Sequence, residues 1–493
     1  MKRILRNIFI AASAACALVS CYGIKVKDYP TLAPITISVL SDTVNALMGQ
    51  EFVYEGVTVK SVPDVTYEWA VGSPEKGTTI SQHQFASIQT ISTSPTINYT
   101  FTKIGSYILR LKVDNGESIE FHYFTLNVNA GYDEGILILD NAPDGTGELT
   151  FVKTLTTEEK NRGEQQLFTI DVGIEIKNGK DLFMSDMTST DGQQFTALLV
   201  ATDDGEGTIY HLEPKTMELF ATAKMSEWGT YCAEFGGEYA RTKTFTNYFL
   251  SADGRFFRYD MTVGGIHEMT DVRTTMSRIY PMTNRSTDVG ETTRYPCIFS
   301  PDSVSIRVSA SQGLVTNYPD GYRVIGVGTP RTGYYLYALL QNKSNPSEYK
   351  IISGSMNKTW SDPKNIKEVL TFTNNDLKMD INSKMVGVKK SNDLYYNYGN
   401  AIYRWGLASQ PASIPAITLP SGETLCDFCT NFIGRVKSND GEDSIIIATY
   451  NPSRSGEKKG SVYVYSVETQ QMTASYEGIC NEPAAIVYKY RIN

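Results

Sequence analysis

A strand–turn–strand segment recurs along most of the chain, and this repetition constrains the fold more than any other feature. Four copies are clear, at residues 198–219, 247–269, 394–409 and 445–472. Their second strands centre on Ile209, Phe256, Ile402 and Val462, at intervals of 47, 146 and 60 residues. Repeats of about 40 to 50 residues with four short strands each are typical of β-propeller blades. We therefore expect residues 131–493 to form a β-propeller of about seven blades, although six or eight blades, or a series of β-sandwiches, also give regular short strands.

Two isolated apolar strands lie at the ends of this region. Residues 135–140 (GILILD) follow its start, and residues 484–490 (AAIVYKY) lie close to the last residue. Closing a propeller removes two exposed sheet edges when strands from its start and its end share one blade. We expect residues 135–140 to pair within that final blade.

The region before residue 130 also alternates between apolar and polar residues. In residues 107–113 (YILRLKV) every second residue is apolar, which is the period-two pattern of a half-buried strand. Asn115-Gly116 follows, and this pair favours a hairpin turn because both residues tolerate positive φ. The pattern predicts a small β-domain over residues 35–130.

This region resembles the PKD-like module, an immunoglobulin-type β-sandwich, through residues 65–72 (VTYEWAVG) and 97–116 (INYTFTKIGSYILRLKVDNG). The resemblance implies that Trp69 is a core residue and that Gly105 forms the turn before the strand of Tyr107. The loop after Trp69 departs from the family, because VGSPEKG stands where Gly-Asp-Gly is usual. Tyr67 and His122 are expected to pack within the β-structure rather than to bind a ligand. The module would act as a spacer or a contact domain.

The N-terminus has the layout of a secretory signal. Three basic residues precede the apolar stretch 8–19, which is shorter than the roughly 20 residues that span a bilayer. Residues 18–21 (LVSC) resemble the bacterial lipobox, which implies removal of residues 1–20 and lipidation of Cys21. Two or three acyl chains hold a protein stably on a membrane. Residues 21–34 would then be a lipid-anchored linker; an ordinary signal peptide with an incidental cysteine is the alternative.

Charge and cysteine content narrow the possible partners. The formal net charge is −9, and removal of residues 1–20 makes it more negative, so nucleic acid is not expected as a partner. Five cysteines remain after Cys16 and Cys21. Cys426 and Cys429 form a CxxC motif, but no second pair and no βαβ pattern accompany it. Buried thiols or a local disulfide are expected there rather than redox chemistry or a zinc site.

The sequence carries no familiar catalytic motif. It lacks a Gly-x-Ser-x-Gly elbow, a His-Glu-x-x-His motif, a phosphate-binding loop and a dinucleotide fingerprint. The acidic turns 203–206 and 440–443 do not match the twelve-residue calcium loop. We therefore predict no catalytic residue, no metal and no cofactor.

Aromatic residues are the better candidates for ligand binding, because ring faces contact sugars and peptides in concave sites. The candidates lie in three segments of the second region: Trp228, Tyr231, Tyr318, Tyr322, Tyr395, Tyr396 and Tyr398. Propeller loops gather around the central channel, which would bring such residues together. Packing within strands is the alternative for each of them.

In organisation the whole chain resembles the PKD-like lipoproteins of Bacteroidetes. That resemblance implies an outer-membrane lipoprotein that accompanies a nutrient-uptake system with a TonB-dependent transporter and its lid lipoprotein. The leading hypothesis is non-catalytic binding of a glycan, a peptide or a partner of that complex. A propeller hydrolase or lyase, recognised by carboxylates or a histidine converging at the channel mouth, is one alternative, and a structural assembly factor or adhesin is another. The sequence leaves open which membrane face the protein occupies.

Overall fold

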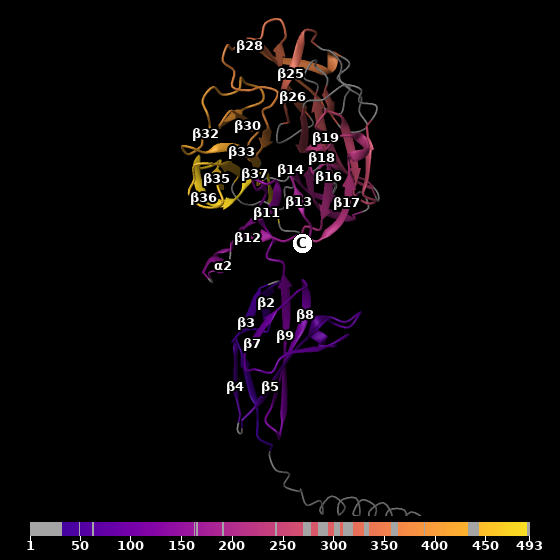
Figure 1. The fold of residues 1–493 in the computed structure, drawn as a ribbon, viewed down its shortest axis with the longest axis vertical. Coiled ribbons are helices and arrows are strands. Elements are labelled where there is room, and N and C mark those ends of the chain that lie inside the picture. The colour runs from indigo at the N-terminus through magenta and orange to yellow at the C-terminus, as the bar shows by residue number, and fades with distance from the viewer. Residues whose placement is uncertain are drawn as a thin grey trace, which may run out of the picture. The chain divides into compact units, whose positions relative to one another are not determined.

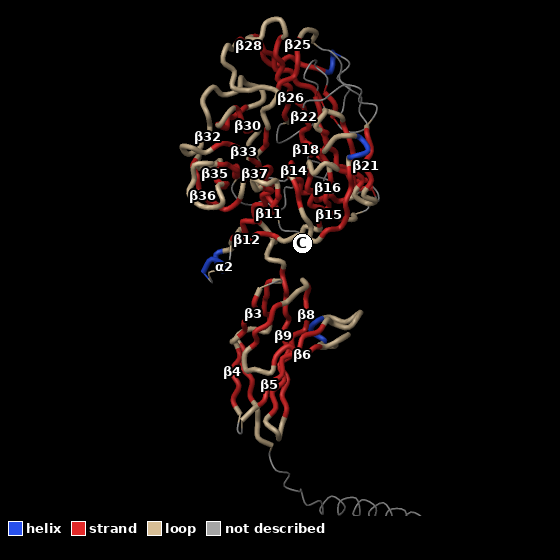
Figure 2. The backbone as a smooth tube through the Cα atoms, in the orientation of Figure 1, coloured by secondary structure: helices blue, strands red, loops and turns tan. Residues whose placement is uncertain are grey.

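The computed structural model describes residues 32–490, apart from 49, 62–63, 162, 164–165, 190–191, 242–243, 270–277, 284–293, 300–305, 309–318, 330–334, 356–362, 389 and 432–442. The chain divides into two compact units, residues 1–129 and 130–493, each described by itself below. Strands make up almost all of the described regular structure in both units (Figures 1 and 2). The cleavage site and Cys21 lie outside the described residues.

The first unit is an immunoglobulin-like β-sandwich. Its larger sheet has the order β2-β9-β8-β5-β6, and two strand pairs, β1-β4 and β3-β7, complete it. The bounds are β1 (Thr36–Val39), β2 (Thr43–Leu47), β3 (Glu51–Tyr54), β4 (Val57–Lys60), β5 (Thr66–Gly72), β6 (Gln89–Ser92), β7 (Ile97–Thr100), β8 (Gly105–Asp114) and β9 (Ile119–Asn129), with the 3₁₀ turn η1 (Ile80–Gln82). Apolar side chains from all three groups of strands form one shared core.

The hairpin and the core tryptophan of this unit lie where the sequence predicts. β8 and β9 pair in register from Gly105 to Asp114, and Gly116 takes a φ of 83° in the turn between them. Trp69 is fully buried, and its indole Nε1 donates to the carbonyl oxygen of Ser94 at 3.1 Å. The ring of His122 packs on Phe124, and its Nε2 lies 2.8 Å from Asp42 Oδ1. Alternating burial along β8 therefore organises this core.

The second unit is a β-propeller of antiparallel sheets, most of them four-stranded. Blade 1 has the order β37-β10-β11-β12, with β13 paired to β11; blades 2, 3, 5, 6 and 7 are β14–β17, β18–β21, β25–β28, β29–β32 and β33–β36. Strands β22–β24, which lie between blades 3 and 5 in the chain and join the edge of β18, are numbered blade 4. The predicted all-β architecture of a β-sandwich followed by a propeller is confirmed.

The strands of blades 1 to 3 are β10 (Gly135–Asn141), β11 (Thr146–Lys153), β12 (Leu167–Ile170), β13 (Ile176–Lys177), β14 (Gly179–Thr188), β15 (Gln194–Thr202), β16 (Thr208–Leu212), β17 (Leu219–Lys224), β18 (Cys232–Arg241), β19 (Thr244–Ser251), β20 (Phe256–Asp260), β21 (Gly265–Glu268) and the closing strand β37 (Glu482–Lys489). Two short helical elements, α2 (Thr157–Asn161) and η2 (Ser226–Trp228), lie in the connections.

The remaining strands are β22 (Arg278–Thr283), β23 (Arg294–Phe299), β24 (Ile306–Val308), β25 (Tyr322–Gly328), β26 (Tyr335–Asn342), β27 (Glu348–Ser355), β28 (Ile366–Thr373), β29 (Met385–Gly387), β30 (Leu394–Tyr398), β31 (Ala401–Trp405), β32 (Ile417–Thr418), β33 (Thr424–Thr430), β34 (Ser444–Tyr450), β35 (Gly460–Ser466) and β36 (Gln471–Cys480), with η3 (Pro363–Asn365) before β28. Among the described residues, no helix is both long and apolar enough to cross a membrane.

Blade 1 closes the ring with strands from both ends of the unit. β10 pairs antiparallel with β37, with Ile138 opposite Ile486, so the predicted pairing of residues 135–140 is confirmed. We expected the start of the unit to contribute one strand to the closing blade. Instead it contributes the three outer strands, β10, β11 and β12, and the end of the unit contributes only the innermost strand, β37. Further bonds join the two ends, including Tyr488 OH donating to Glu134 Oε1 at 2.6 Å. Both sheet edges are thereby satisfied.

Candidate functional site at one end of the channel

The innermost strands of five blades share one irregularity close to their beginning. Each has one extra residue that the neighbouring strand does not match, at Lys180, Ala233, Ile325, Cys426 and Ala484. Such β-bulges bend a strand and re-aim the side chains beside it. Because the innermost strands all run in the same direction through the propeller, the five bulges lie at the same end of the central channel.

The residue after each bulge occupies an equivalent place in its blade. These residues are Asp181, Glu234, Gly326, Asp427 and Ala485 in blades 2, 3, 5, 7 and 1. Strands β14, β18, β33 and β37 lie near the middle of the propeller in Figure 1, and β14 contacts both β18 and β37. Three carboxylates therefore project from one end of the innermost strands of three blades.

Two of these carboxylates join neighbouring blades. Asp181 Oδ2 accepts a hydrogen bond from the backbone N–H of Phe235 in blade 3 at 2.7 Å. Asp427 Oδ2 accepts one from the backbone N–H of Ile486 in blade 1 at 2.9 Å. Phe235 and Ile486 both stand two residues after a bulge, so the two bonds are equivalent by the symmetry of the fold. Charge-assisted bonds of this kind fix the spacing of adjacent innermost strands.

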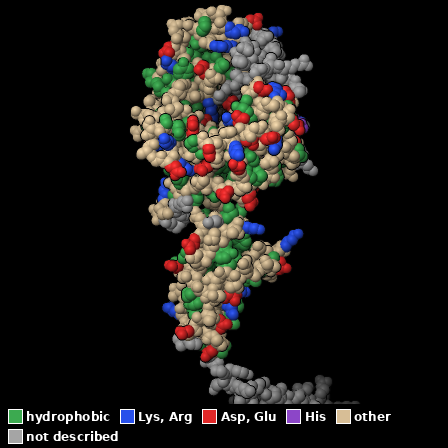
Figure 3. Space-filling view, viewed as in Figure 1, with side chains coloured by type: hydrophobic (Ala, Val, Ile, Leu, Met, Phe, Trp, Pro, Cys, Tyr) green, Lys and Arg blue, Asp and Glu red, His purple; other side chains and the backbone are tan. Residues whose placement is uncertain are grey.

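A lysine provides the counter-charge at this end of the channel. Lys384, directly before the short innermost strand β29 of blade 6, donates from Nζ to Asp427 Oδ1 at 2.6 Å. Its side chain is 33% exposed and that of Asp427 is 11% exposed, so the pair is deep but still reached by solvent. Figure 3 shows a hollow in the propeller with acidic and basic side chains around it. We call Asp181, Glu234, Asp427 and Lys384 the channel cluster.

Electrostatics distinguish the members of the channel cluster. Burial raises the pKa of Asp181 to about 7; Lys384 and the N–H of Phe235 oppose this rise, while Asp427 and Glu234 add to it. Burial by itself would lower the pKa of Lys384, but Asp427 and Asp181 outweigh it and hold the pKa above its usual value. A carboxyl group that titrates near neutral pH in a solvent-accessible channel is a candidate functional group.

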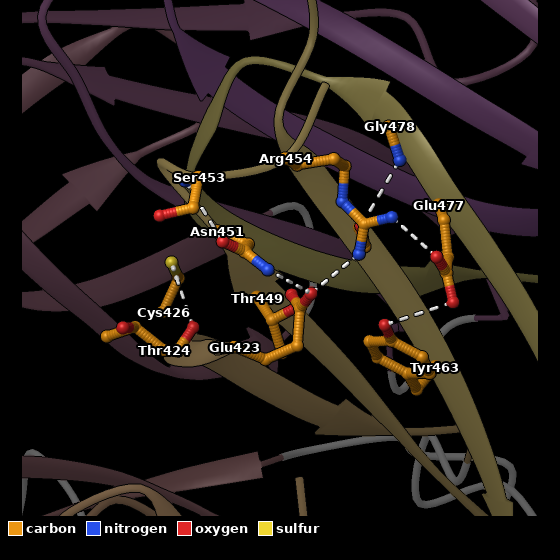
Figure 4. A network of polar contacts seen from close by, with 11 residues as sticks. Glu423, Thr424, Cys426, Thr449, Asn451, Ser453, Arg454, Tyr463, Glu477 and Gly478 are labelled. Carbon is orange, nitrogen blue, oxygen red and sulfur yellow. Dashed lines mark hydrogen bonds and ion pairs between the residues drawn. The ribbon is translucent and has the colours of Figure 1, made fainter. Parts of the chain in front are cut away.

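A second polar network lies within blade 7, beside the beginning of β33 (Figure 4). Glu423, whose side chain is 2% exposed, accepts from Arg454 Nη2 at 2.6 Å and from Thr449 Oγ1 at 2.6 Å. Arg454 also donates to Glu477 Oε2 at 2.5 Å, and Asn451 Nδ2 donates to Glu423 Oε1 at 3.3 Å. Each buried charge in this network has an opposite charge and further hydrogen bonds, which is the arrangement expected of a structural element.

The predicted aromatic residues do not form one cluster. Tyr322, Tyr395 and Tyr396 are at most 8% exposed and lie in the cores between blades. Burial raises the pKa of Tyr395 to about 12, in keeping with that environment. These three positions therefore serve packing, the alternative that the sequence left open. Tyr318 lies outside the described residues.

The other three predicted aromatic residues are partly exposed. Trp228 packs edge-on against Phe257, Tyr231 lies under the Lys180 ammonium at 5.3 Å, and Tyr398 is 38% exposed. Tyr231 precedes an innermost strand and Tyr398 ends a second strand, so both belong to the face on which the channel cluster opens. They stay candidates for ligand contact.

The cysteines of the CxxC motif are half-buried free thiols, so the expectation of a local disulfide is wrong and that of buried thiols is met only in part. Burial raises the pKa of both Cys426 and Cys429 to about 12, which disfavours the reactive thiolate. No cluster of three or more metal-ligating side chains occurs among the described residues. Neither histidine of the propeller joins the channel cluster, because His211 is buried between blades and His267 lies on the outer strand β21.

The channel cluster was missed because its members are far apart in sequence. A usable signal does exist: Lys180-Asp181-Leu182, Ala233-Glu234-Phe235 and Cys426-Asp427-Phe428 each place an acidic residue before an apolar one at the start of an innermost strand. Alignment of first strands, rather than of the second strands that carry the repeat, would have revealed it.

We compared the chain with protein-family models, with curated proteins and with solved structures. No protein-family model and no curated protein matches the chain. Among solved structures, a quinonprotein alcohol dehydrogenase-like protein from Bacteroides thetaiotaomicron aligns over 92% of this chain and 99% of its own, with 15% identity and a TM-score of 0.45. Sqt1 from Saccharomyces cerevisiae aligns over 71% of this chain and 87% of its own, with 13% identity and a TM-score of 0.38. At these values the likeness carries no functional information.

Proposed function

We propose that this protein is a lipid-anchored outer-membrane protein that binds a nutrient polymer, a glycan or a peptide, or a partner of an uptake complex, without transforming it. The PKD-like module would act as a spacer, and the propeller face on which the channel cluster opens would be the contact surface. The carrying observation is the convergence of Asp181, Glu234, Asp427 and Lys384 at a solvent-accessible channel end. Such convergent polar groups in a concavity are what a binding site needs.

Binding is favoured over catalysis by the hydrogen bonds of the carboxylates. Asp427 uses one oxygen for Lys384 and the other for Ile486 N–H. Asp181 uses its two oxygens for the backbone N–H groups of Phe235 and Leu182. Carboxylates held in this way shape and charge the channel but are poorly placed to exchange protons with a substrate.

The test is a panel of glycans and peptides incubated with the purified protein, with thermal shift and product release followed together. A ligand that raises the melting temperature and is recovered intact supports the proposal. Tyr398→Ala should weaken that binding, because Tyr398 ends the second strand β30 on the channel-cluster face. Tyr335→Ala is the matched control, because Tyr335 begins the second strand β26 at the opposite end of the blades and is 54% exposed.

A hydrolase or lyase is the second candidate, and one observation favours it. Three carboxylates converge at the channel end, and Asp181 has a pKa of about 7, which suits a proton donor at neutral pH. Product release in the same panel that disappears in Asp181→Asn would establish this activity. It would also refute the non-catalytic proposal.

The membrane anchor and the partners are tested separately. Labelled palmitate should enter the wild-type protein but not Cys21→Ser expressed in a bacterium that processes lipoproteins. Crosslinking in cells of the source organism should capture a TonB-dependent transporter or its lid lipoprotein. Failure to incorporate label would overturn the anchor, and crosslinks confined to unrelated proteins would overturn the uptake partnership.

A further inference from the structure

The interface between blades 2 and 3 contains buried polar atoms that have no partner in the protein. They are Nδ2 and Oδ1 of Asn247, the hydroxyl of Tyr259 and Nδ1 of His211. All three side chains are at most 2% exposed. Among the described residues only two other buried side-chain atoms lack a partner, so this interface holds most of them. Buried polar atoms without a protein partner call for an explanation.

Asn247 lies in a row of polar side chains that crosses blade 3. On the register of the sheet it stands opposite Glu238 of β18 on one side and Tyr259 of β20 on the other. Residues opposite one another in a sheet share a face. Phe245 and Phe249, two residues either side of Asn247, pack in the core shared with blade 2, so the amide faces that interface.

Other blades place an aliphatic side chain where blade 3 has Asn247. In blade 3 the residue after the bulge, Glu234, pairs with Leu250 of the second strand. Asn247 stands three residues before Leu250. The same count gives Leu198, Leu336, Ile445 and Ile136 in blades 2, 5, 7 and 1. All four are buried apolar residues. Propeller packing therefore does not require an amide at this position.

Rotation of the amide does not remove the problem. A flip of the Asn247 side chain exchanges Nδ2 and Oδ1, and both sites lack a partner. Because Nδ2 only donates and Oδ1 only accepts, the amide needs a hydrogen-bond acceptor at Nδ2 and a donor at Oδ1, and a metal cation cannot satisfy Nδ2. Ser185 Oγ donates to Glu238 Oε2 at 2.5 Å in the same interface, so further polar groups are close to the row.

We propose that ordered water occupies the interface between blades 2 and 3, hydrogen-bonded to both side-chain atoms of Asn247. The Tyr259 hydroxyl and His211 Nδ1 bind further buried water in this interface. The rings of His211 and Tyr259 meet edge to face with centroids 6.2 Å apart, so both residues belong to the same interface. Water is the ligand that supplies a donor and an acceptor within a small enclosed space.

A crystal structure of the purified protein that resolves ordered water tests this inference. We expect water density within about 3.2 Å of both Asn247 Nδ2 and Oδ1. In Asn247→Leu, which restores the side chain found in blades 2 and 5, that density should be lost. An interface without water, or an Asn247 amide bonded to protein atoms, would overturn the proposal.

Melting temperatures give a second test. Leucine occupies the equivalent position of blades 2 and 5 and needs no hydrogen bond, so Asn247→Leu should displace the water and melt at or above the wild-type temperature. Leu336→Asn places an amide at the equivalent position of blade 5 and should melt several degrees lower. If Asn247→Leu also melts several degrees lower, the interface has no room for water and the proposal fails; if that variant does not fold, the wild-type density decides.

Discussion

Blades 2 and 7 place an aspartate at the same point of the propeller but give it different surroundings. Asp181 and Asp427 both follow a bulge, and both accept a backbone N–H of the next blade. Asp427 also binds the Lys384 ammonium directly at 2.6 Å, whereas the pKa of Asp181 rises to about 7 through burial and the nearby carboxylates. The same bulge followed by an aspartate thus holds an ion pair in blade 7 and a carboxyl group with a pKa near neutral in blade 2.

This difference follows from the order of the blades. Lys384 stands before the innermost strand of blade 6, next to blade 7, so it reaches Asp427 directly. Blade 1 separates blades 7 and 2, and its equivalent residue, Ala485, carries no charge. Asp181 receives the lysine's field at longer range than Asp427 does. The position of one cation around the ring therefore decides which of the two carboxyl groups is paired directly with it and which has the raised pKa.

The largest expected effect comes from breaking the ion pair between Asp427 and Lys384. Asp427→Ala leaves Lys384 without its direct partner and the N–H of Ile486 unpaired, and the free energy of unfolding should fall by about 3 kcal/mol. Urea unfolding followed by tryptophan fluorescence measures this. Asp376→Ala is the control, because Asp376 pairs with Lys378 at 2.5 Å while 79% exposed, and little change is expected there. Equal losses in the two variants would contradict a special role for Asp427.

Asp181, which has no direct ion-pair partner among the described residues, should make the free energy of unfolding depend on pH. The pKa of Asp181 in the folded protein, about 7, lies above its value in the unfolded chain of about 3.9. The folded state then holds the proton more tightly, so stability from this group is present below pH 4 and is lost as pH rises to about 7. In the wild-type protein this group should lower the free energy of unfolding by about 2 to 4 kcal/mol between pH 4 and 8, and Asp181→Asn should abolish that decrease. Identical pH profiles for variant and wild type would refute the raised pKa.

The network of blade 7 extends the comparison to a carboxylate that is more deeply buried than Asp427. Arg454→Met removes the cation from Glu423 but leaves Thr449 and Asn451 bound to it. The free energy of unfolding should fall by about 2 kcal/mol. Arg404→Met, at an exposed pair whose atoms are 3.7 Å apart, should have little effect in the same assay. A larger loss for Arg404→Met would refute the assignment of Glu423 as the buried partner.

The smallest effect is a change in thiol reactivity beside the ion pair. Burial raises the pKa of Cys429 to about 12; Lys384 lowers it and Asp427 raises it. In Asp427→Asn the lysine acts alone, so alkylation of Cys429 at pH 8 should become several-fold faster. Mass spectrometry of the modified peptide identifies the site. The buried Cys232 is the internal control, because faster labelling there would indicate local opening instead.

Much of the fold was predictable because it depends on short-range patterns. The alternation in residues 107–113 and the Asn115-Gly116 turn predict the β8–β9 hairpin, which the structure contains. The spacing of the hairpin segments predicts a propeller, and the isolated strand at 135–140 predicts its closure. The aromatic site was less predictable, since tyrosine serves strand packing as readily as ligand contact, and Tyr396 is fully buried.

The sequence by itself determined the all-β composition, the two-part organisation that we expected and the closing strand, because side-chain alternation and turn chemistry act over a few residues. Only the tertiary structure decided that Asp181, Asp427 and Lys384 belong to one channel end, because ring closure brings together strands that are hundreds of residues apart. It also decided that Cys426 and Cys429 stay free thiols and that Asn247 replaces a core leucine. Charge, burial and partner atoms are set by neighbours in space, which no local pattern of residues specifies.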